Sequence, residues 1–274
     1  MTLPPPVRTV ARTIWHDDTV SEGSRTIPEE SAVALTYNRA THAVMLATPA
    51  DLEDFAIGFS LAEGIVESPA EITELEIVAV PRGIELRMSL AADRLGSLTT
   101  RHRRLTGPSG CGMCGLDSLA DAIRPVPRIT SAARFDAATI AAAVAALPSA
   151  QHLNLQTRAV HAAGFFTPAG GLIAVREDVG RHNALDKLGG ALARQGVTMD
   201  SGLLVLTSRV SVEMVQKAAI LGAPVIVAVS APTALAVRVA EEAGITLIGI
   251  ARQDGFEVFT HPARIIPHRV QHVA

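Results

Sequence analysis

The stretch GLLVLTSRVSVEMVQKAAILGAPVIVAVSAPTALAVRVAEEAGITLIGIA, residues 202–251, repeats one pattern, a short apolar run followed by a segment of helical periodicity. Its three apolar runs have the length and the β-branched content of buried strands. They are GLLVLTS (202–208), PVIVAVS (224–230) and ITLIGIA (245–251). Between them, residues 211–221 and 232–243 space their apolar residues as helices do. Strands that alternate with helices predict a mostly parallel sheet covered on both faces.

The segments on either side extend this sheet. AAGFFTPAGGLIAVRED (162–178) is predicted to form a hairpin, and FEVFTH (256–261) a final strand. Further helices are expected at 135–147, at about 151–161 and at 180–195. The leading hairpin distinguishes this order from a dinucleotide-binding domain, and the chain has neither a Gly-x-Gly-x-x-Gly after a strand nor a Walker loop.

The first half of the chain predicts a smaller α+β fold. Four strands are expected in two pairs, 31–38 with 41–48 and 72–80 with 83–90. A helix is expected to start at Thr48-Pro49-Ala50-Asp51, which offer a hydroxyl cap and a proline in the first turn, and to end at Gly64. Residues 1–25 show no periodicity and are expected to form a tail or an irregular strand.

These patterns divide the chain into three parts. We expect a small α+β domain over 1–100, a flexible connector over 101–130 and an α/β domain over 131–274. A net charge of −3 argues against a general attraction to nucleic acid or to anionic membranes. The uncharged segment 218–237 has the length of a membrane span, but Gly222, Pro224 and Pro232 interrupt it, so no membrane helix is expected. No export signal is visible, and a cytoplasmic location is expected.

Both cysteines of the chain lie in TGPSGCGMCGLDSL (106–119), and four interpretations of them remain open. Cys111 and Cys114 supply only two of the four ligands of a structural metal site, which His102 or a second subunit would have to complete. They resemble a redox pair, but they lie between domains rather than at a strand-to-helix junction. They can be inert and buried, although glycines surround them. They can also carry sulfur, because a nucleophilic thiolate on a loose, glycine-rich tether is able to reach two partners.

A set of blocks along nearly the whole chain resembles the FdhD family, the formate dehydrogenase accessory sulfurtransferases. The blocks are ALTYN (34–38), DLEDFAIGFSLAEGIVES (51–68), GCGMCG (110–115), EDVGRHNALDKLGG (177–190), TSRVSVEMVQKAA (207–219), SAPTALAVRVAEEAGITLIGIAR (230–252) and THPARI (260–265). The resemblance implies a cytosolic homodimer that accepts sulfur from a cysteine desulfurase. It would pass this sulfur to the molybdenum cofactor, bis(molybdopterin guanine dinucleotide), before the cofactor enters apo-formate dehydrogenase.

The resemblance also implies roles for individual residues. Cys111 matches the cysteine that bears the persulfide, and Cys114 would assist it. The cofactor-binding stretch of the family matches Ile250, Ala251, Arg252, Gln253, Asp254 and Gly255. A non-catalytic chaperone that binds the cofactor for apo-formate dehydrogenase is the alternative function, and a thiol-disulfide oxidoreductase is another.

The second domain of the family resembles the three-layer cytidine deaminase fold, a mixed sheet with helices on both faces. Deaminases bind zinc at two helix starts through H-x-E and P-C-x-x-C. The corresponding starts, GRHNALDK (180–187) and TSRVSVEM (207–214), contain no cysteine, so no zinc site is expected.

The same two helix starts are candidates for binding the phosphates of the cofactor, because helix N-termini with nearby cations attract anions. The candidate side chains are Arg181, His182, Arg209 and Lys217. Asp254 is a candidate acceptor for the guanine ring, and GDP or GTP is expected to mimic the cofactor. Glu177 and Asp178 are as readily interpreted as caps of the following helix, and His182 as a packed side chain.

Overall fold

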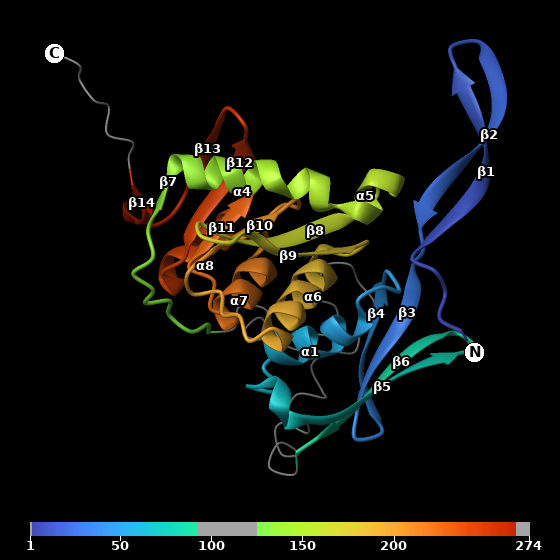
Figure 1. Ribbon diagram of the computed structural model, residues 1–274, viewed down its shortest axis with the longest axis horizontal. Helices are drawn as coiled ribbons and strands as arrows, with labels where there is room; N and C mark the ends of the chain where they lie inside the picture. The colour runs from blue at the N-terminus through green and yellow to red at the C-terminus, as the bar shows by residue number, and fades with distance from the viewer. Residues whose placement is uncertain (1, 92–124, 267–274) are drawn as a thin grey trace.

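The computed structural model of the chain describes residues 2–91 and 125–266 (Figure 1). The C-terminal part is built on a six-stranded sheet with the order β13-β12-β11-β10-β8-β9. Its strands are β8 (His161–Thr167), β9 (Gly171–Asp178), β10 (Leu203–Leu206), β11 (Val225–Ala228), β12 (Thr246–Arg252) and β13 (Gly255–Val258). Strands β10, β11 and β12 are parallel, whereas β8 and β13 run antiparallel to their neighbours. The sheet is therefore mixed, as the leading hairpin predicts.

Helices lie on both faces of this sheet (Figure 1). They are α4 (Ala137–Ala150), α5 (His152–Thr157), α6 (Arg181–Arg194), α7 (Val212–Ile220) and α8 (Ala234–Ala243). Leu204 and Leu206 of β10 belong to the core shared with α6, α7 and α8, whereas Leu203 and Val205 belong to the core shared with α4. The predicted helices and strands of this part are confirmed, except that the helix expected at 151–161 ends at Thr157 because β8 begins at His161. The likeness to the cytidine deaminase fold stays a prediction.

The N-terminal part contains a four-stranded sheet with the order β4-β3-β6-β5 and one long helix. Its elements are β3 (Ser31–Tyr37), β4 (Ala40–Ala47), α1 (Leu52–Ala62), η1 (Pro69–Glu71), β5 (Ile72–Val80) and β6 (Gly83–Leu90). Helix α1 packs on the inner face of the sheet through Phe55 and Phe59. The two strand pairs are confirmed, but the predicted start of the helix is wrong. Asp51 is the residue before the first turn, and the Thr48 hydroxyl instead accepts a hydrogen bond from the Val179 N–H, 3.1 Å away.

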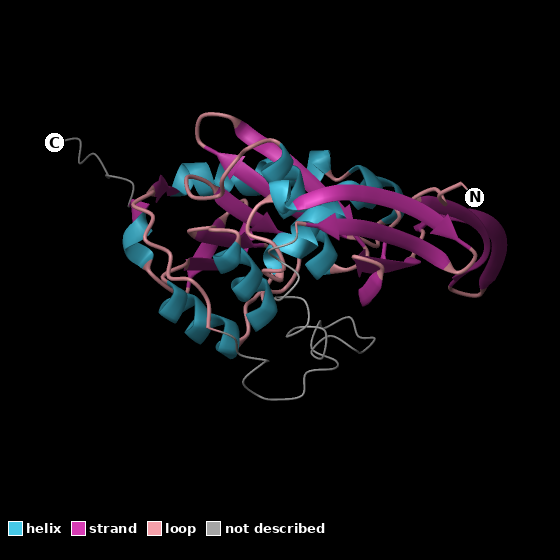
Figure 2. Ribbon diagram, turned by 90° about the horizontal axis from the view of Figure 1, so that it is seen from below, coloured by secondary structure: helices cyan, strands magenta, loops and turns pink. Residues whose placement is uncertain are grey.

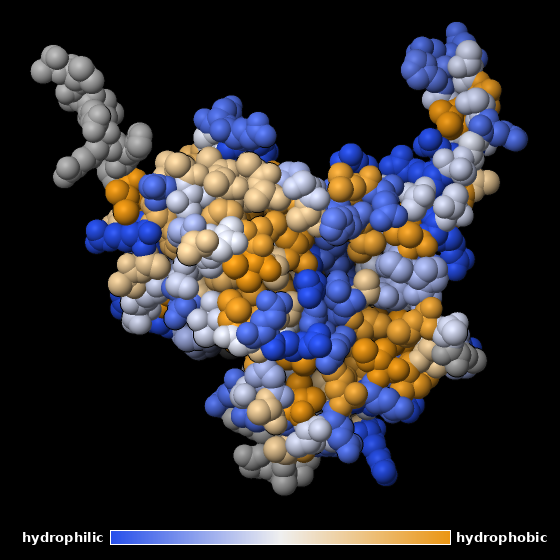
Figure 3. All heavy atoms as spheres, viewed as in Figure 1, coloured by the Kyte–Doolittle hydropathy of each residue, from blue (hydrophilic) through white to orange (hydrophobic). Residues whose placement is uncertain are grey.

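The expectation of an irregular N-terminus is also wrong. Residues 7–28 form a regular hairpin, β1 (Val7–His16) with β2 (Thr19–Pro28), which projects from the body as an arm (Figure 1). Most side chains of the arm are exposed on both of its faces, so the sequence has no alternation between buried and exposed positions to reveal it. Its surface is mainly hydrophilic (Figure 3), and Trp15 at its tip is 75% exposed.

The two parts join where α1 crosses α6 (Figure 1), within the body of packed helices and strands that Figure 2 shows from below. Glycines allow the two backbones to touch, since a Cβ atom on Gly58 would lie 1.7 Å from the Asp186 carbonyl oxygen. The short strands β7 (Phe135–Asp136) and β14 (Ile265–Ile266), with the turn η4 (Pro262–Arg264), pair at the far end of the C-terminal part. Residues 218–237 form the end of α7, β11 and the start of α8. In the described part of the chain, no helix is long and apolar enough to cross a bilayer.

Candidate functional site

The candidate site lies at the edge of the six-stranded sheet where β9, β10, β11 and β12 end, which we call the carboxyl edge. These four strands point the same way, because β9 and β10 are both antiparallel to β8 and because β10, β11 and β12 are parallel. Helices α6, α7 and α8 therefore all begin at this edge, and the segment 250–255 reaches it from β12. Open α/β sheets bind ligands at this edge.

A fully buried hydrogen-bond network holds the start of α6. The Asp178 carboxylate accepts from the Gly180 N–H at 2.7 Å, the Asn183 amide at 2.9 Å, the Thr48 N–H at 2.9 Å and the Lys187 ammonium at 2.7 Å. Lys187 also donates to the Thr48 carbonyl oxygen at 2.8 Å. Both charged side chains have no solvent exposure. The network therefore fixes the first turn of α6 against the chain segment between β4 and α1.

Glu177 and Asp178 do not share the role that the sequence left open for them. Adjacent residues of a strand point to opposite faces of a sheet. Glu177 accordingly faces α5 and accepts from the N–H groups of Leu153 and Asn154, both at 2.8 Å. Asp178 alone contacts the start of α6.

Lys217 is placed away from the edge, inside the contact between α1, α6 and α7. Its ammonium donates to Asp186 at 2.8 Å and lies 2.9 Å from Glu63. Burial alone would lower the pKa of Lys217, but the two carboxylates outweigh burial and raise it. Burial raises the pKa of Asp186 to about 6, against the attraction of Lys217. The ammonium is thus occupied, and Lys217 is not part of the binding site proposed below.

The first turn of α6 carries His182 and Arg181. His182 is 5% exposed, and burial together with the charges of Arg181 and Lys217 lowers its pKa to about 3. Burial and Arg181 also lower the pKa of the neighbouring His161. His182 is therefore a neutral imidazole near pH 7. One of its ring nitrogens can donate a hydrogen bond and the other can accept one, but the ring does not act as a cation.

Four buried polar atoms on the first turns of α6 and α7 have no hydrogen-bond partner among the described residues. They are Arg181 Nε, His182 Nε2, Ser211 Oγ and Glu213 Oε2, which we call the unpaired set. Buried polar atoms are nearly always paired in folded proteins, and exceptions need an explanation. The sequence prediction missed Glu213, because a carboxylate in the first turn of a helix is usually explained by the helix dipole.

The segment predicted to bind the cofactor is a strand end and a turn rather than a loop. Ile250 and Arg252 lie in β12, next to a break in its register with β13, and Gly255 begins β13. Ile250 has a left-handed backbone with φ 52° and is 39% exposed, an unusual conformation for a β-branched residue. The Arg252 guanidinium donates to the carbonyl oxygens of Val229 and Ala251.

The remaining predicted residues vary in their exposure. Gln253 and Asp254 are exposed at the turn, whereas Ala251 is buried. Arg209 is exposed in the segment between β10 and α7, and so reaches the same edge as Arg181. Cys111 and Cys114 lie outside the described residues.

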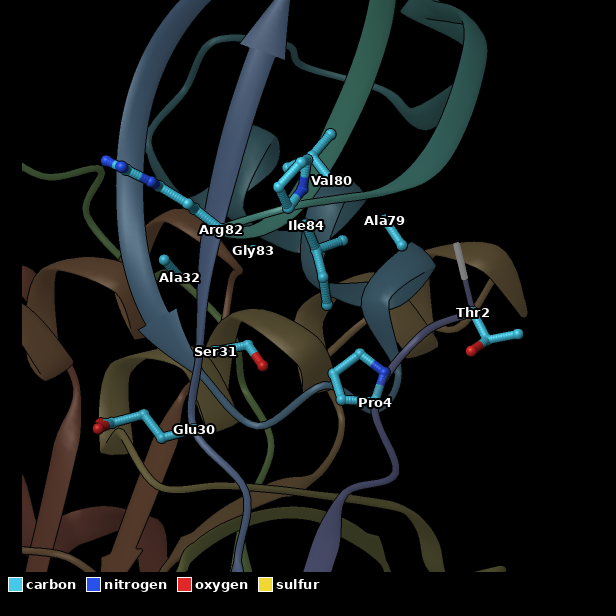
Figure 4. Close-up of a pocket in the computed structure, with 11 residues that line it drawn as sticks. Thr2, Pro4, Glu30, Ser31, Ala32, Ala79, Val80, Arg82, Gly83 and Ile84 are labelled. Carbon is cyan, nitrogen blue, oxygen red and sulfur yellow. The ribbon is translucent and has the colours of Figure 1, made fainter.

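A metal site and a surface groove are two other kinds of site that a chain can offer. Within residues 2–91 and 125–266, no group of three or more His, Cys, Asp or Glu side chains is placed to hold a metal ion. A shallow groove of about 480 Å³ lies between the N-terminal segment and the β5–β6 turn, lined by residues such as Pro4, Glu30 and Arg82 (Figure 4). It shares no residue with the carboxyl edge.

Comparison with known proteins gives consistent results. The sequence profile described as the FdhD/NarQ family matches residues 28–266. The Sulfur carrier protein FdhD of Agrobacterium fabrum is 52% identical over 260 residues, which cover 94% of this chain and 96% of the relative. The protein of the same name from Brucella abortus is 55% identical over 246 residues, covering 89% and 91%. A crystal structure described as that of a formate dehydrogenase accessory protein, from Desulfotalea psychrophila, superposes with a TM-score of 0.73 at 25% identity, covering 96% of this chain and all of that one.

Proposed function

This chain belongs to the FdhD/NarQ family, and on that ground we propose that it is a sulfur carrier required for formate dehydrogenase activity. The observation that carries the proposal is the identity of 52% and 55%, over most of the chain, to relatives named sulfur carrier proteins. The partners that we propose are a cysteine desulfurase, apo-formate dehydrogenase and a second copy of this chain.

The first step that we propose is a persulfide transfer to Cys111. The Cys111 thiolate attacks the outer sulfur of a persulfide on the desulfurase, whose S–S bond breaks, and the desulfurase cysteine leaves as a thiolate. The step needs no oxidant, since one S–S bond replaces another. Only about 3% of a free thiol is ionised at pH 7, so any neighbouring positive charge accelerates the attack.

The second step delivers the sulfur to molybdenum, with bis(molybdopterin guanine dinucleotide) as the substrate. The Cys114 thiolate attacks the inner sulfur of the Cys111 persulfide, and the outer sulfur leaves as a sulfide anion that binds the metal. The two electrons that reduce this sulfur come from the thiols, which end as a Cys111–Cys114 disulfide. A cellular thiol reductant restores them.

We place the cofactor at the carboxyl edge. The support is that neither α6 nor α7 has a side-chain cap at its start among the described residues, so their first backbone N–H groups suit phosphate oxygens, with Arg181 and Arg209 as the cations. Arg252 and Asp254 lie at the end of β12 beside them. Because the described residues supply cations and helix N-termini together, they suit the pyrophosphate groups of such a dinucleotide.

Mass spectrometry tests the sulfur relay. After incubation with a desulfurase and cysteine, we expect Cys111 to gain the mass of one sulfur atom, and Cys111→Ala to gain none. A chaperone would activate formate dehydrogenase equally well with Cys111→Ala, and a thiol-disulfide oxidoreductase would reduce a disulfide such as that of insulin. Either result without the sulfur adduct would exclude the relay.

Calorimetry with GDP tests the cofactor site separately. Replacing Arg181 or Arg252 with alanine removes a charge-assisted hydrogen bond to phosphate and is expected to weaken GDP about tenfold or more. Arg82→Ala is the matched control, because Arg82 is exposed at the β5–β6 turn, in the N-terminal sheet. Equal affinities of all these variants would remove the carboxyl edge from the cofactor site.

A further inference from the structure

The unpaired set contains one group that phosphate binding does not explain. Arg181 Nε and the helix N-termini are donors, which suit an anion. Glu213 Oε2 is a carboxylate oxygen that is buried and accepts no hydrogen bond within the described residues. A buried acceptor without a donor costs about 1–3 kcal/mol, and more when it is charged. An anionic phosphate would increase this cost through repulsion.

The helix geometry places Glu213 beside the proposed phosphate site. Lys217 of α7 contacts Asp186 of α6 at 2.8 Å. Glu213 precedes Lys217 by four residues, and His182 precedes Asp186 by four, so each lies one turn nearer the carboxyl edge on the same face of its helix. Both helices start at that edge, and the unpaired atoms of Glu213 and His182 therefore lie on the facing sides of the two first turns. His182 is 5% exposed, and Glu213 is partly buried.

A ligand that suits both halves of the unpaired set must bring phosphate oxygens and N–H donors together. Guanine and pterin rings share one edge, on which a ring N–H and an exocyclic amino group stand side by side. A carboxylate accepts from both at once, as it does from a guanidinium. Adenine offers an unprotonated ring nitrogen and a C–H at these positions, and xanthine replaces the amino group with a carbonyl oxygen that repels a carboxylate.

We infer that Glu213 recognises this shared N–H edge of a guanine or pterin ring, while Arg181 and the helix N-termini bind the phosphates next to it. The inference rests on the proposed function, since a guanylated pterin cofactor carries both rings. The ring's donors then satisfy Glu213 Oε2, and His182 Nε2 and Ser211 Oγ are left to pair with the polar atoms of the sugar or the ring.

Asp254 is another carboxylate at the carboxyl edge, but it is poorly suited to select a base. It is exposed at the β12–β13 turn, where water replaces any hydrogen bond that a wrong base fails to make. Glu213 Oε2 is buried, so a base without the matching donors leaves it unpaired. Sites with buried hydrogen-bonding groups reject ligands that lack the partner group far more strongly than exposed ones do.

Calorimetry with GDP, inosine diphosphate and xanthosine diphosphate tests the inference. Inosine diphosphate lacks the amino group and xanthosine diphosphate replaces it with an oxygen. For the unaltered protein we expect GDP to bind at least about tenfold more tightly than inosine diphosphate, with xanthosine diphosphate weakest. Glu213→Gln is expected to weaken GDP about tenfold or more and to lessen the penalty against xanthosine diphosphate, because its amide N–H donates to the xanthine oxygen.

Asp254→Asn is the matched control, because it makes the same chemical change on the exposed carboxylate of the same edge. Free pterin identifies the ring. If pterin binding rather than GDP binding depends on Glu213, the shared edge is recognised on the pterin, which supports the inference. Equal binding of the three nucleotides, together with pterin binding that Glu213→Gln leaves unchanged, would overturn it. A Glu213→Gln variant that melts like the unaltered protein and binds both GDP and pterin like it would also overturn it, and so would a change confined to Asp254→Asn.

The two proposals fail in different assays. Sulfur loading of Cys111 does not involve the nucleotide, so a missing sulfur adduct with intact base selection would refute the relay alone. Normal sulfur loading, with pyrophosphate bound as tightly as GDP and pterin binding unchanged by Glu213→Gln, would refute the role of Glu213 alone.

Discussion

Replacing Gly190 with alanine should separate α6 from α1. An ideal Cβ at this position would lie 1.9 Å from the Asp54 carbonyl oxygen and 2.9 Å from the Gly58 nitrogen, whereas ordinary contacts begin at 3.4 Å. The nearest obstacle is a backbone atom of a helix, which cannot rotate away as a side chain does. The helices must therefore move apart by about 1.5 Å at this point, the difference between these two distances.

The expected cost follows from the contacts that this movement strains. Overfilling a packed interior typically costs about 1–3 kcal/mol, and a clash between two backbones lies at the upper end. The movement also stretches the Lys217–Glu63 pair, 2.9 Å, and the Arg194–Asp54 pair, 2.8 Å, which both join α1 to the C-terminal part. The better helix propensity of alanine returns about 1 kcal/mol. We expect a net loss of about 2 kcal/mol from these two effects, to which the strained ion pairs add, and this is a large share of the stability of a typical protein.

Gly189→Ala is the control on the same helix. Its Cβ would meet only side-chain atoms of Leu221, the nearest at 3.0 Å, and these can rotate. Urea denaturation followed by circular dichroism should give this variant the midpoint of the unaltered protein or a slightly higher one, and Gly190→Ala a clearly lower midpoint. Equal midpoints for the two variants would refute the claim that the α1–α6 crossing depends on backbone contact.

Three further predictions concern the buried charges and the arm. Asp178→Ala leaves the Lys187 ammonium buried without its partner and should cost about 3–5 kcal/mol in urea denaturation, and the added change Lys187→Met should recover part of it. His182 takes up a proton below pH 6.5 when unfolded but only near pH 3 when folded, so it lowers stability as pH falls through this window, by up to about 4 kcal/mol. His182→Gln should therefore lose less stability than the unaltered protein between pH 6.5 and pH 4, and parallel losses would contradict this. Trp15, the only tryptophan, should emit like free indole in both the folded and the unfolded protein, and a blue-shifted native emission would show that something covers the arm.

The helices and strands of the C-terminal part were predictable because each buries one face. Leu203 and Val205 face one core while Leu204 and Leu206 face the other, and such continuous apolar runs stand out between segments of helical spacing. The arm was not predictable on this basis, since residues 7–28 bury neither face. Secondary structure is predicted from the spacing of apolar residues, and a segment that buries neither face has no such spacing.

The candidate site was only partly predictable, because the environment of a side chain depends on distant segments. The positions of Arg181 and Arg209 follow from two helix starts at one sheet edge. Lys217 is held away from this edge by Asp186 and by Glu63, and Glu63 is the C-cap of α1 in the other half of the chain. Glu213 has an ordinary place in a helical pattern, and only its burial without a donor makes it notable.

The contrast between neighbouring buried groups is the strongest argument that the carboxyl edge binds a ligand. Asp178 lies at the start of α6, is fully buried and accepts four hydrogen bonds. On the first turns of α6 and α7, His182 Nε2 and Glu213 Oε2 are buried with no partner among the described residues. Because the same region supplies every hydrogen bond that Asp178 needs, poor packing does not explain why the atoms of Glu213 and His182 are unpaired. The N-terminal part fixes the start of α6 through Thr48 and holds the body of α7 through the Glu63–Lys217 pair, so the unpaired atoms are held in place for the ligand that we propose before it binds.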